Sequence, residues 1–439
     1  MQNQKVYIET MGCAMNTRDS QHLIGELSKV GYVEVKEAKE ADLILINTCS
    51  VREKPERKLF SEIGQFAKIK KPHAKIGVCG CSASHMGAQI LQKAPSVDFV
   101  LGARNVSKIT DIIKREKAVE ISLDHDDSTY VFNTHAPSQV KALLNISIGC
   151  DKHCTYCIVP HTRGKEISIP MDLILKEAEK LAKQGVKEIL LLGQNVNNYG
   201  VRFSSKHPKV NFSALLENLS QIEGLKRIRF TSPHPLHMDN AFLECFAKNP
   251  KVCKSIHIPL QSGSNAILKA MKRGYSKEWY LDRITRLKSL VPDVGISTDI
   301  IIGFPGETQQ DFEQTLEVLE QVRFDTLYSF IYSARPLTPA YHLEKVPKNI
   351  AHHNLERLQS RHREILEQKA KGEVGKVHQV LIENITEPLA EGRSDNGRLL
   401  IFEALNARVG DLVRVQVVAH HKGRLKGRLI EDFNLVKAL

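Results

Sequence analysis

The chain has 439 residues, more than one ordinary domain holds, and this length predicts about three domains. Its 42% hydrophobic and 26% charged residues are typical of a globular protein with buried cores. A net charge of +12 would favour a nucleic-acid partner, because lysine and arginine displace counterions from phosphates, but charge alone does not decide this. No run of about 18 apolar residues and no N-terminal signal pattern are present, so we expect a cytoplasmic protein without a membrane contact.

The first region, residues 1–121, alternates between strand and helix patterns. We expect strands at 6–10, 43–46, 75–78 and 98–101, and helices at 17–30 and 56–70. The run 43–46 is apolar at every position, which is typical of a strand buried on both faces of a parallel sheet. The region is therefore predicted to be a doubly wound α/β domain. Residues 122–141 are polar and aperiodic, and we interpret them as a linker.

The second region, residues 142–371, repeats the alternation on a longer scale. Six apolar strand candidates are present, at 143–148, 188–193, 226–231, 255–259, 294–302 and 325–332. Each but the last is followed by a helical pattern, so the region fits an incomplete or full (β/α) barrel with its chemistry at the C-terminal ends of the strands. A charged helix is expected at 351–371.

The tail, residues 372–439, changes character. Short β-type runs separated by Gly and Asn turns occur at 377–382, 399–402, 412–418 and 425–430. This pattern predicts a small β-barrel.

Three cysteines form a C-x3-C-x2-C motif directly after the first predicted barrel strand: Cys150, Cys154 and Cys157. Three thiolates this close together can ligate three irons of a [4Fe–4S] cluster and leave the fourth iron open. The amino and carboxylate groups of S-adenosylmethionine (SAM) can chelate that iron, and an electron from the cluster can then split the C–S bond of SAM. The motif therefore predicts a radical SAM enzyme.

The main alternative for this motif is a zinc site. Zinc normally takes a fourth protein ligand, for which His153 and His161 are the candidates. The position at the end of the first barrel strand favours the SAM cluster. Tyr156 stands where such a loop packs on the adenine of SAM, so we expect it to contact this cofactor.

Three further cysteines each follow a predicted strand of the first region: Cys13, Cys49 and Cys81. The C-terminal ends of parallel strands lie on one edge of the sheet, so these thiols can converge on one site with three protein ligands. The alternative is that they are small buried residues, as free cysteines often are. Cys79 is a rival to Cys81, but a residue inside a strand is less free to reach the edge. Cys245 and Cys253 are predicted to be packing residues.

Seven segments spread over the chain carry a family resemblance: 11–16 (MGCAMN), 47–53 (NTCSVRE), 149–160 (GCDKHCTYCIVP), 192–197 (LGQNVN), 260–264 (LQSGS), 298–308 (TDIIIGFPGET) and 332–336 (YSARP). They resemble the radical SAM methylthiotransferases along nearly the whole chain, and the residues of these motifs are most similar to those of the MiaB branch. The tail resembles the TRAM domain, an RNA-binding barrel of the OB type. Two positions depart from the family pattern, Ile169 in place of an arginine and Leu337 in place of a glycine.

The resemblance implies an enzyme that converts N6-isopentenyladenosine, next to the tRNA anticodon, to its 2-methylthio derivative. It implies two [4Fe–4S] clusters and two uses of SAM. One SAM methylates sulfur held at Cys13, Cys49 and Cys81, and the other is cleaved at the second cluster to a radical that removes hydrogen from C2 of the adenine. Acid–base chemistry is of little use on such a C–H bond, so the cofactors carry the hard step.

The resemblance also implies an electron donor such as flavodoxin or ferredoxin, and we expect a monomer. Sister enzymes that modify threonylcarbamoyl-adenosine in tRNA, or an aspartate of a ribosomal protein, are alternatives. An iron–sulfur electron carrier or an RNA-binding protein without catalysis is an alternative of another class.

Residues at the ends of the second, fourth and fifth predicted barrel strands are candidates for binding SAM: Gly193, Gln194, Asn195, Gln261, Ser262, Gly263 and Asp299. The alternative is that they form turns at the top of the barrel. Four basic residues of the tail are candidates for RNA contacts: Lys422, Arg424, Lys426 and Arg428. A solvated charged face is the alternative there.

Overall fold

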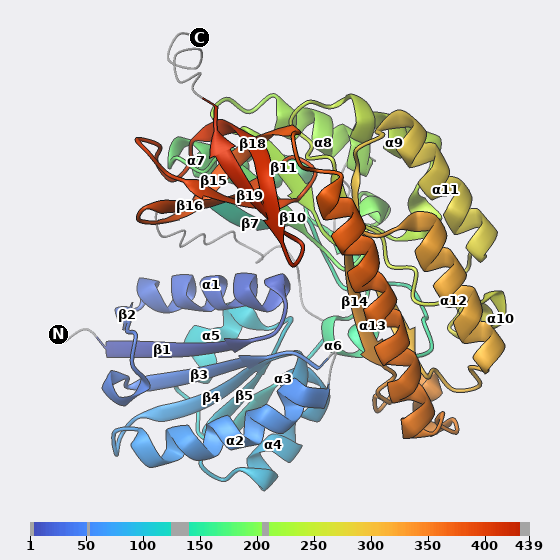
Figure 1. Cartoon of the computed structure of the whole chain (residues 1–439). Coiled ribbons are helices and arrows are strands. Elements are labelled where there is room, and N and C mark those ends of the chain that lie inside the picture. The colour runs from blue at the N-terminus through green and yellow to red at the C-terminus, as the bar shows by residue number, and fades with distance from the viewer. Residues whose placement is uncertain (1–3, 51–52, 124–139, 204–209, 431–439) are drawn as a thin grey trace.

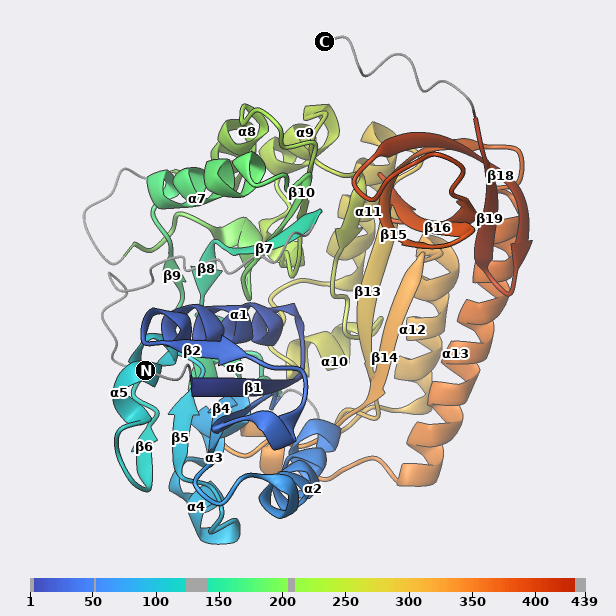
Figure 2. The ribbon, with the colours of Figure 1, turned by 90° about the vertical axis from the view of Figure 1, so that its left-hand side faces the viewer.

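The computed structural model describes residues 4–50, 53–123, 140–203 and 210–430. Figures 1 and 2 show three parts: an N-terminal α/β domain, a central barrel of parallel strands surrounded by helices, and a C-terminal closed β-barrel. The predicted fold class is therefore confirmed for each part. The predicted linker lies almost wholly outside the described residues. Within the described ranges, no helix has the length and apolar content that a membrane span needs.

The N-terminal domain is built on a six-stranded parallel sheet with the order β2-β1-β3-β4-β5-β6. Its strands are β1 (Gln4–Met11), β2 (Tyr32–Glu34), β3 (Leu43–Thr48), β4 (Lys75–Gly80), β5 (Phe99–Gly102) and β6 (Ala118–Glu120). Every residue of β3 is buried, as its apolar run predicts. The edge strands β2 and β6 were not predicted, because three-residue strands carry too little pattern to be detected.

Helices cover both faces of this sheet. On one face, α1 (Ala14–Lys29) and α5 (Ile109–Ile112) form a core with side chains such as Leu45 and Phe99. On the other face lie α2 (Glu53–Ile69), α3 (Cys81–Met86) and α4 (Ala88–Lys93), which pack on side chains such as Ile46 and Val78. The prediction of a doubly wound domain is thus confirmed.

The central part contains six parallel strands in two groups of three. Their bounds are β7 (Lys141–Asn145), β10 (Glu188–Leu192), β11 (Arg227–Phe230), β12 (Ser255–His257), β13 (Gly295–Ile302) and β14 (Thr326–Ile331). A parallel bridge between Ile228 and Val252 joins the two groups. The predicted strand 143–148 is broken in the structure, since β7 ends at Asn145 and Ser147–Ile148 (β8) pairs antiparallel with Ile167–Ser168 (β9).

Helices surround the outside of these strands. They are α6 (Val159–Arg163), α7 (Met171–Lys183), α8 (Phe212–Ser220), α9 (Asn240–Lys248), α10 (Asn265–Ala270), α11 (Lys277–Leu290), α12 (Gln309–Val322) and α13 (Lys348–Lys371). Alternate strand residues, such as Ile296 and Ile300, join the helices in the largest hydrophobic core. The residues between them therefore face the inside of the barrel.

The C-terminal part is a closed β-barrel, as predicted, with five strands where the sequence indicated four. Its strands are β15 (Val377–Thr386), β16 (Leu389–Ser394), β17 (Leu399–Glu403), β18 (Leu412–His421) and β19 (Arg424–Leu429). This barrel lies over the N-terminal ends of the central strands. Arg227 donates hydrogen bonds to the carbonyl oxygens of Arg393 and Gln379, at 2.7 and 2.8 Å.

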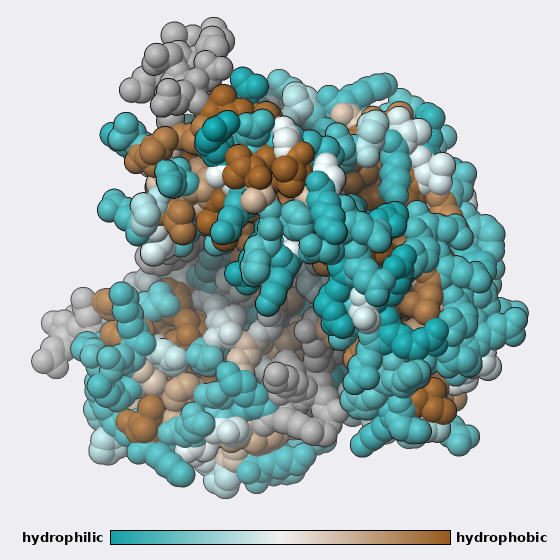
Figure 3. Space-filling view, viewed as in Figure 1, coloured by the Kyte–Doolittle hydropathy of each residue, from teal (hydrophilic) through white to brown (hydrophobic). Residues whose placement is uncertain are grey.

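The N-terminal domain packs against the other end of the central strands. Helix α3 contacts α6, and α1 contacts β7. In the view of Figure 3, the molecule is hollowed between the C-terminal barrel above and the N-terminal domain below. The edge of the N-terminal sheet and the top of the central barrel therefore face each other.

Candidate functional site

The three predicted cysteines of the N-terminal domain lie together at the C-terminal edge of its sheet. Cys13 follows β1, Cys49 follows β3, and Cys81 follows β4 as the first residue of α3. A hydrogen bond from Cys49 and the charge of the nearby Arg163 lower the pKa of the Cys13 thiol to about 6, against the opposing effect of burial. Burial raises the pKa of Cys81, while the positive charge of Arg163 acts in the other direction.

A buried polar network supports this edge from below. Asn47 donates hydrogen bonds to the Asn16 carbonyl oxygen at 2.8 Å and to the Ser20 hydroxyl at 2.9 Å. Asn16 in turn donates to the Asn47 side chain at 3.2 Å, and its own side-chain oxygen accepts from the Cys13 backbone at 3.4 Å. The first turn of α1 is thereby held against the end of β3, which brings Cys13 and Cys49 together.

Arg163 connects this edge to the central barrel. It is the last residue of α6, six residues after Cys157, and its guanidinium is buried beside Cys81. The same guanidinium forms a 2.6 Å ion pair with Asp19 of α1. Arg104, also buried, donates at 2.7 Å to the backbone oxygen of Arg163 and so holds α6 from the other side.

The C-x3-C-x2-C motif forms a compact loop between β8 and α6. The Cys157 amide donates to the Cys154 carbonyl oxygen, and the Lys152 amide points at the Cys150 sulfur at 3.5 Å. Burial raises the pKa of Cys150 to about 11 and that of Cys157 to about 12, and the neighbouring thiols add to both shifts. The three thiols thus form one electrostatically coupled group in which a positive charge would stabilise the thiolates.

Arg273 supplies a positive charge at this loop. It is 7% exposed, and it donates to the Cys154 sulfur at 3.4 Å, to the Tyr156 hydroxyl at 3.4 Å and to the Tyr275 hydroxyl at 3.0 Å. No carboxylate pairs with it in the part of the chain that the structure describes. A buried cation with only neutral partners is costly, so the arrangement fits an anionic group at Cys154.

The end of β10 carries three predicted SAM contacts. The Gln194 side-chain oxygen accepts from the Gly149 backbone, next to Cys150, at 2.5 Å. Asn195 is buried and donates to Glu166, which also accepts from Asn198 at 2.9 Å. Burial raises the pKa of Glu166 to about 7. Gln194 therefore lies at the cysteine loop. Asn195 instead points to the buried carboxyl group of Glu166, which it shares with Asn198.

The glycine at the end of β10 and the segment after β12 are closely packed. A Cβ atom at Gly193 would lie 2.4 Å from the Ser147 hydroxyl, and one at Gly263 would lie 2.5 Å from the backbone of α12. Ser262 is fully buried, and its hydroxyl accepts from the Ser264 amide. Gln261 has a φ of 75° and pairs through its backbone with β13. These four residues shape the top of the barrel, and their backbone groups are what they can offer a cofactor.

Tyr156 and Asp299 reach the interior of the barrel from two sides. Tyr156 packs edge-to-face on Phe304, with ring centroids 6.5 Å apart, in the loop after β13. Asp299 lies within β13 and accepts from His257 at 3.2 Å. In the tail, Arg424, Lys426 and Arg428 alternate along β19 with their side chains exposed. Lys422 is exposed in the turn before this strand.

Both cysteine groups are compatible with iron–sulfur clusters, because three thiols lie together in each and each thiolate can ligate a different iron. Each group also has a buried arginine, Arg163 or Arg273, against a sulfur.

The remaining cysteines and Ile169 are buried or half-buried, whereas Leu337 is exposed. The Cys79 side chain is in the core beneath β4, Cys245 lies on α9 near the Ser213 carbonyl oxygen, and Cys253 is 1% exposed. Ile169 is buried in the central core, where an apolar side chain is favourable. Leu337 is 61% exposed with a φ of 68°, a backbone conformation that favours glycine.

Three charged residues of the site were not predicted from the sequence. Asp19, Arg163 and Arg273 are ordinary charged residues until the fold buries them. The available signal was proximity to cysteine motifs in the chain, which applies to Arg163 but not to Arg273.

Relatives with known names match nearly the whole chain. The tRNA-2-methylthio-N(6)-dimethylallyladenosine synthase of Helicobacter pylori (strain HPAG1) is 70% identical over 429 residues, which cover 96% of this chain and 98% of that protein. The enzyme of the same name from Helicobacter hepaticus is 61% identical, and the match covers 99% of this chain and 96% of that protein.

Two family models and one solved structure agree with the division of the fold. Residues 5–102 match the uncharacterized protein family UPF0004, and residues 144–319 match the radical SAM superfamily. The radical S-adenosylmethionine methyltransferase TsrM from Kitasatospora setae, with cobalamin and a [4Fe-4S] cluster bound, has a TM-score of 0.57 at 14% identity. That similarity covers 78% of this chain and 77% of the other, and it shows a shared fold.

Proposed function

Because the chain belongs to the family of tRNA-2-methylthio-N(6)-dimethylallyladenosine synthases, we propose that it adds a methylthio group to C2 of N6-isopentenyladenosine in tRNA. It is a radical SAM enzyme, and its cofactors are [4Fe–4S] clusters and SAM. The resemblance read from the cysteine motifs is thereby confirmed at the level of the family. The sister substrates, a threonylcarbamoyl-adenosine and a ribosomal aspartate, are disfavoured by the same relatives.

One structural observation carries the proposal. The two cysteine groups come from different domains, yet Arg163 lies six residues after one group in the chain and its charge acts on Cys81 of the other. A reaction that needs both a SAM-cleaving centre and a sulfur donor requires such proximity, because the substrate carbon must meet both within one cavity.

The six cysteines are the ligands that we propose for the clusters. Cys150, Cys154 and Cys157 would hold the SAM cluster, and the group of Cys13, Cys49 and Cys81 would hold the second one. When bound, the clusters and SAM supply the reductive cleavage of SAM and the sulfur and methyl groups of the product. The buried arginines next to Cys81 and Cys154 support this assignment, since each would offset the negative charge of thiolates.

The protein's own contribution is to bind and orient. The ion pair between Asp19 and Arg163 holds α1 against α6, and the network around Asn47 holds Cys13 and Cys49 at the same edge. Gln194 accepts from the backbone beside Cys150 and so positions the SAM loop. These contacts are made in the protein alone, so the two cysteine groups are preorganised before the substrate binds.

We also propose which residues contact SAM and the tRNA, which protein donates electrons, and where the enzyme acts. For SAM we propose Tyr156 and Gln194 through their side chains, and Gly193, Gln261 and Gly263 through their backbones. For the tRNA backbone we propose the exposed basic residues of β19 and its preceding turn. A flavodoxin or ferredoxin would supply electrons, the cytoplasm is the proposed location because tRNA is matured there, and a monomer suffices because one chain carries both cysteine groups.

The test is a single-turnover assay on anaerobically reconstituted protein with SAM and a reductant. Isopentenylated tRNA, threonylcarbamoylated tRNA and the ribosomal protein are offered separately, and the digests are analysed by mass spectrometry. We expect a methylthio product on the isopentenylated tRNA alone. Product on another substrate would move the chain to a sister activity, and 5′-deoxyadenosine without any methylthio product would contradict the proposed function.

A further inference from the structure

The inside of the central barrel contains a polar group that neither cysteine site uses. His257 of β12 lies between Ser297 and Asp299 of β13, with Nδ1 3.0 Å from the Ser297 hydroxyl and Nε2 3.2 Å from the Asp299 carboxylate. Tyr328 of β14 packs edge-to-face on His257, with ring centroids 5.8 Å apart. We name these four residues the lumen group.

The lumen group faces inward because the neighbouring residues face outward. Ile296 and Ile300 alternate with Ser297 and Asp299 and are buried in the core beneath the helices. On β14, the hydroxyl of Ser329 accepts from Gln359 of the outer helix α13, so Tyr328 points the other way.

The lumen group is accessible although it lies inside the fold. The His257 and Asp299 side chains are 21% and 32% exposed, and Tyr328 is 49% exposed. Among the described residues, the Asp299 carboxylate accepts from His257 alone, and no hydrogen bond of the Tyr328 hydroxyl is present. A free acceptor and a free aromatic face therefore line an open space.

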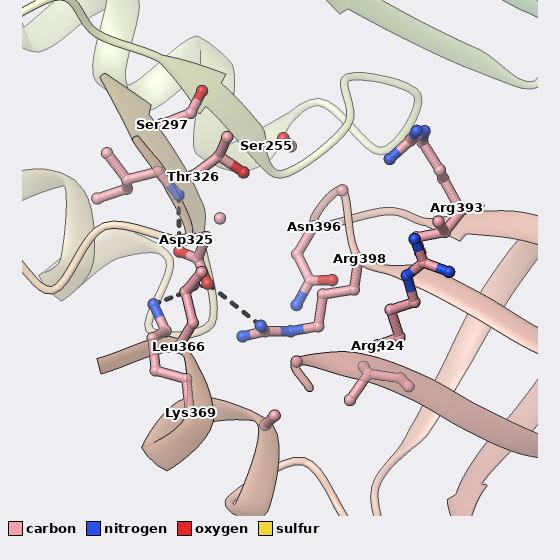
Figure 4. A pocket seen from close by; sticks show the side chains of 17 residues that line it. Ser255, Ser297, Asp325, Thr326, Leu366, Lys369, Arg393, Asn396, Arg398 and Arg424 are labelled. Carbon is pink, nitrogen blue, oxygen red and sulfur yellow. Dashed lines mark hydrogen bonds and ion pairs between the residues drawn. The ribbon is translucent and has the colours of Figure 1, made fainter. Parts of the chain in front are cut away.

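The lumen group itself carries the Asp299 carboxylate and no lysine or arginine, so it disfavours a phosphate ligand. Arg229 of β11 is paired with Glu188 at 3.1 Å and donates to the Ser394 carbonyl oxygen at 2.7 Å. Below the lumen group is a cavity of about 220 Å³, whose lining includes Ser297. Figure 4 shows that two of the four cations in its lining, Lys369 and Arg398, point to Asp325, at 2.7 and 3.2 Å.

An uncharged planar ligand fits this environment. An aromatic ring can stack on Tyr328, and a ligand N–H or hydroxyl can donate to Asp299. The strands on the other side of the barrel present half-buried apolar side chains at their inward positions, Leu143 of β7 and Leu190 of β10. A nucleoside has this combination of a stacking face, donor groups and no charge on the base.

Two adenosines take part in the proposed reaction, that of SAM and that of the tRNA. Asp299 lies three residues before the end of β13, which is about 10 Å inside the barrel at the rise of a β-strand. The cysteine loop that would bind SAM lies at the ends of the strands. Asp299 is deeper in the barrel than the cysteine loop, and Tyr328 lies on the last strand, β14. Both positions favour the adenosine of the tRNA over that of SAM as the ligand of the lumen group.

We propose that Asp299 and Tyr328 hold the target adenosine of the tRNA, with His257 as a positioning residue for the Asp299 carboxylate. This inference rests on the proposed function, since it names the place where the substrate of that reaction binds. It assigns Asp299 to the substrate, whereas the sequence motif suggested a contact to SAM.

The test compares Asp299→Asn, Tyr328→Ala and Tyr328→Phe with the wild type. The matched control is Ser329→Ala, which changes the outward face of the same strand. Affinity for an anticodon stem-loop RNA carrying N6-isopentenyladenosine is measured by fluorescence anisotropy. The KM for SAM is measured from 5′-deoxyadenosine formed without RNA, and methylthio product is measured with RNA.

We expect Asp299→Asn and Tyr328→Ala each to weaken RNA binding about tenfold and to lower the methylthio product in proportion, as for one lost hydrogen bond or one lost stacking contact. The KM for SAM should stay within about twofold of the wild type. Tyr328→Phe and Ser329→Ala should bind RNA like the wild type, because the stacking ring or the whole inward face is kept.

A rise in the KM for SAM with unchanged RNA affinity would overturn the inference and assign Asp299 to SAM. Wild-type RNA affinity in both Asp299→Asn and Tyr328→Ala would also overturn it. A wild-type enzyme that gives no methylthio product on the isopentenylated RNA would instead contradict the proposed function, so the two failures are distinguishable. Circular dichroism of each variant checks that the fold is kept.

Discussion

The Arg163 guanidinium and the Asp19 carboxylate form an ion pair of 2.6 Å with side chains that are only 3% and 2% exposed. Asp19 belongs to α1 of the N-terminal domain, and Arg163 ends α6, the short helix after the SAM-cluster motif. Because the Arg163 guanidinium also lies beside Cys81, the charge that joins the two domains is the charge that acts on the second cysteine group. This ion pair and the hydrogen bond from Arg104 to the Arg163 carbonyl oxygen thus hold the two domains together at this boundary.

Breaking this pair should loosen the boundary between the domains. Asp19→Asn leaves the Arg163 cation without its counter-charge, and the loss of one partner of a buried pair costs about 3–5 kcal/mol. We expect faster hydrogen exchange at the amides of α6 in the apo-protein, and a similar effect from Arg163→Gln. The double variant should cost at least about 1 kcal/mol less than the sum of the single variants. Additive costs would show that the two residues act independently.

Each cysteine group should account for about half of the iron, since a [4Fe–4S] cluster holds about four irons. Replacing the group of Cys150, Cys154 and Cys157 by alanine should remove that share and abolish 5′-deoxyadenosine formation. Replacing the group of Cys13, Cys49 and Cys81 should remove the other share and leave cleavage of SAM detectable. Iron analysis and chromatography check both results. Cys245→Ala is the control, and a loss of iron in it would contradict the assignment.

Arg273 should influence the reduction of the SAM cluster. Its buried cation touches Cys154 without a carboxylate partner among the described residues, so it favours added negative charge nearby. Arg273→Gln should shift the midpoint potential of this cluster to more negative values, and Arg273→Lys should restore part of the shift. The potential is read by EPR in a background in which Cys13, Cys49 and Cys81 are alanine.

A matched control for this variant is Arg283→Gln, which changes an arginine at the surface helix α11. Its potential should equal that of the parent. An unchanged potential in Arg273→Gln would restrict Arg273 to a packing role.

Glu166 should make stability depend on pH. Its side chain is 1% exposed, and burial raises its pKa from 4.5 to about 7. The folded protein therefore holds a proton that the unfolded chain releases, and this contribution is complete below about pH 4.5 and lost as the pH rises to about 7. Glu166→Gln should raise the thermal midpoint of the apo-protein at pH 8 and change it little at pH 5. An equal effect at both values would contradict the raised pKa.

Leu337 should be a strained position. A leucine with a φ of 68° costs about 1 kcal/mol relative to glycine, and its 61% exposed side chain gains little from packing. Leu337→Gly is therefore expected to raise the thermal midpoint slightly. Leu343→Gly is the matched control, because Leu343 is also exposed but has a φ of −74°. It should lower the midpoint or leave it unchanged, and the same response in both variants would show that backbone strain is not the cause.

The sequence predicted well where the physical signal is local. The apolar run at 43–46 predicts a strand buried on both faces, which the structure has, and the close spacing of Cys150, Cys154 and Cys157 predicts a cluster loop. It failed at β16, where the segment LAEGRS carries no apolar run. That strand exists because β15 and β17 supply hydrogen-bond partners on both sides, so its stability is tertiary.

What the sequence determined by itself is therefore the family and its chemistry, a radical SAM enzyme that uses [4Fe–4S] clusters and SAM, and it predicts six cysteines as the ligands. What only the tertiary structure decided is which charges are buried and against what. Asp19 and Arg163 are 144 residues apart, and Arg273 lies 119 residues after Cys154. Spacing along the chain cannot pair such residues, because their interaction depends on burial and on the packing of elements distant in sequence. The same reason applies to His257 and Asp299, whose meeting inside the barrel required the strand pairing of the fold.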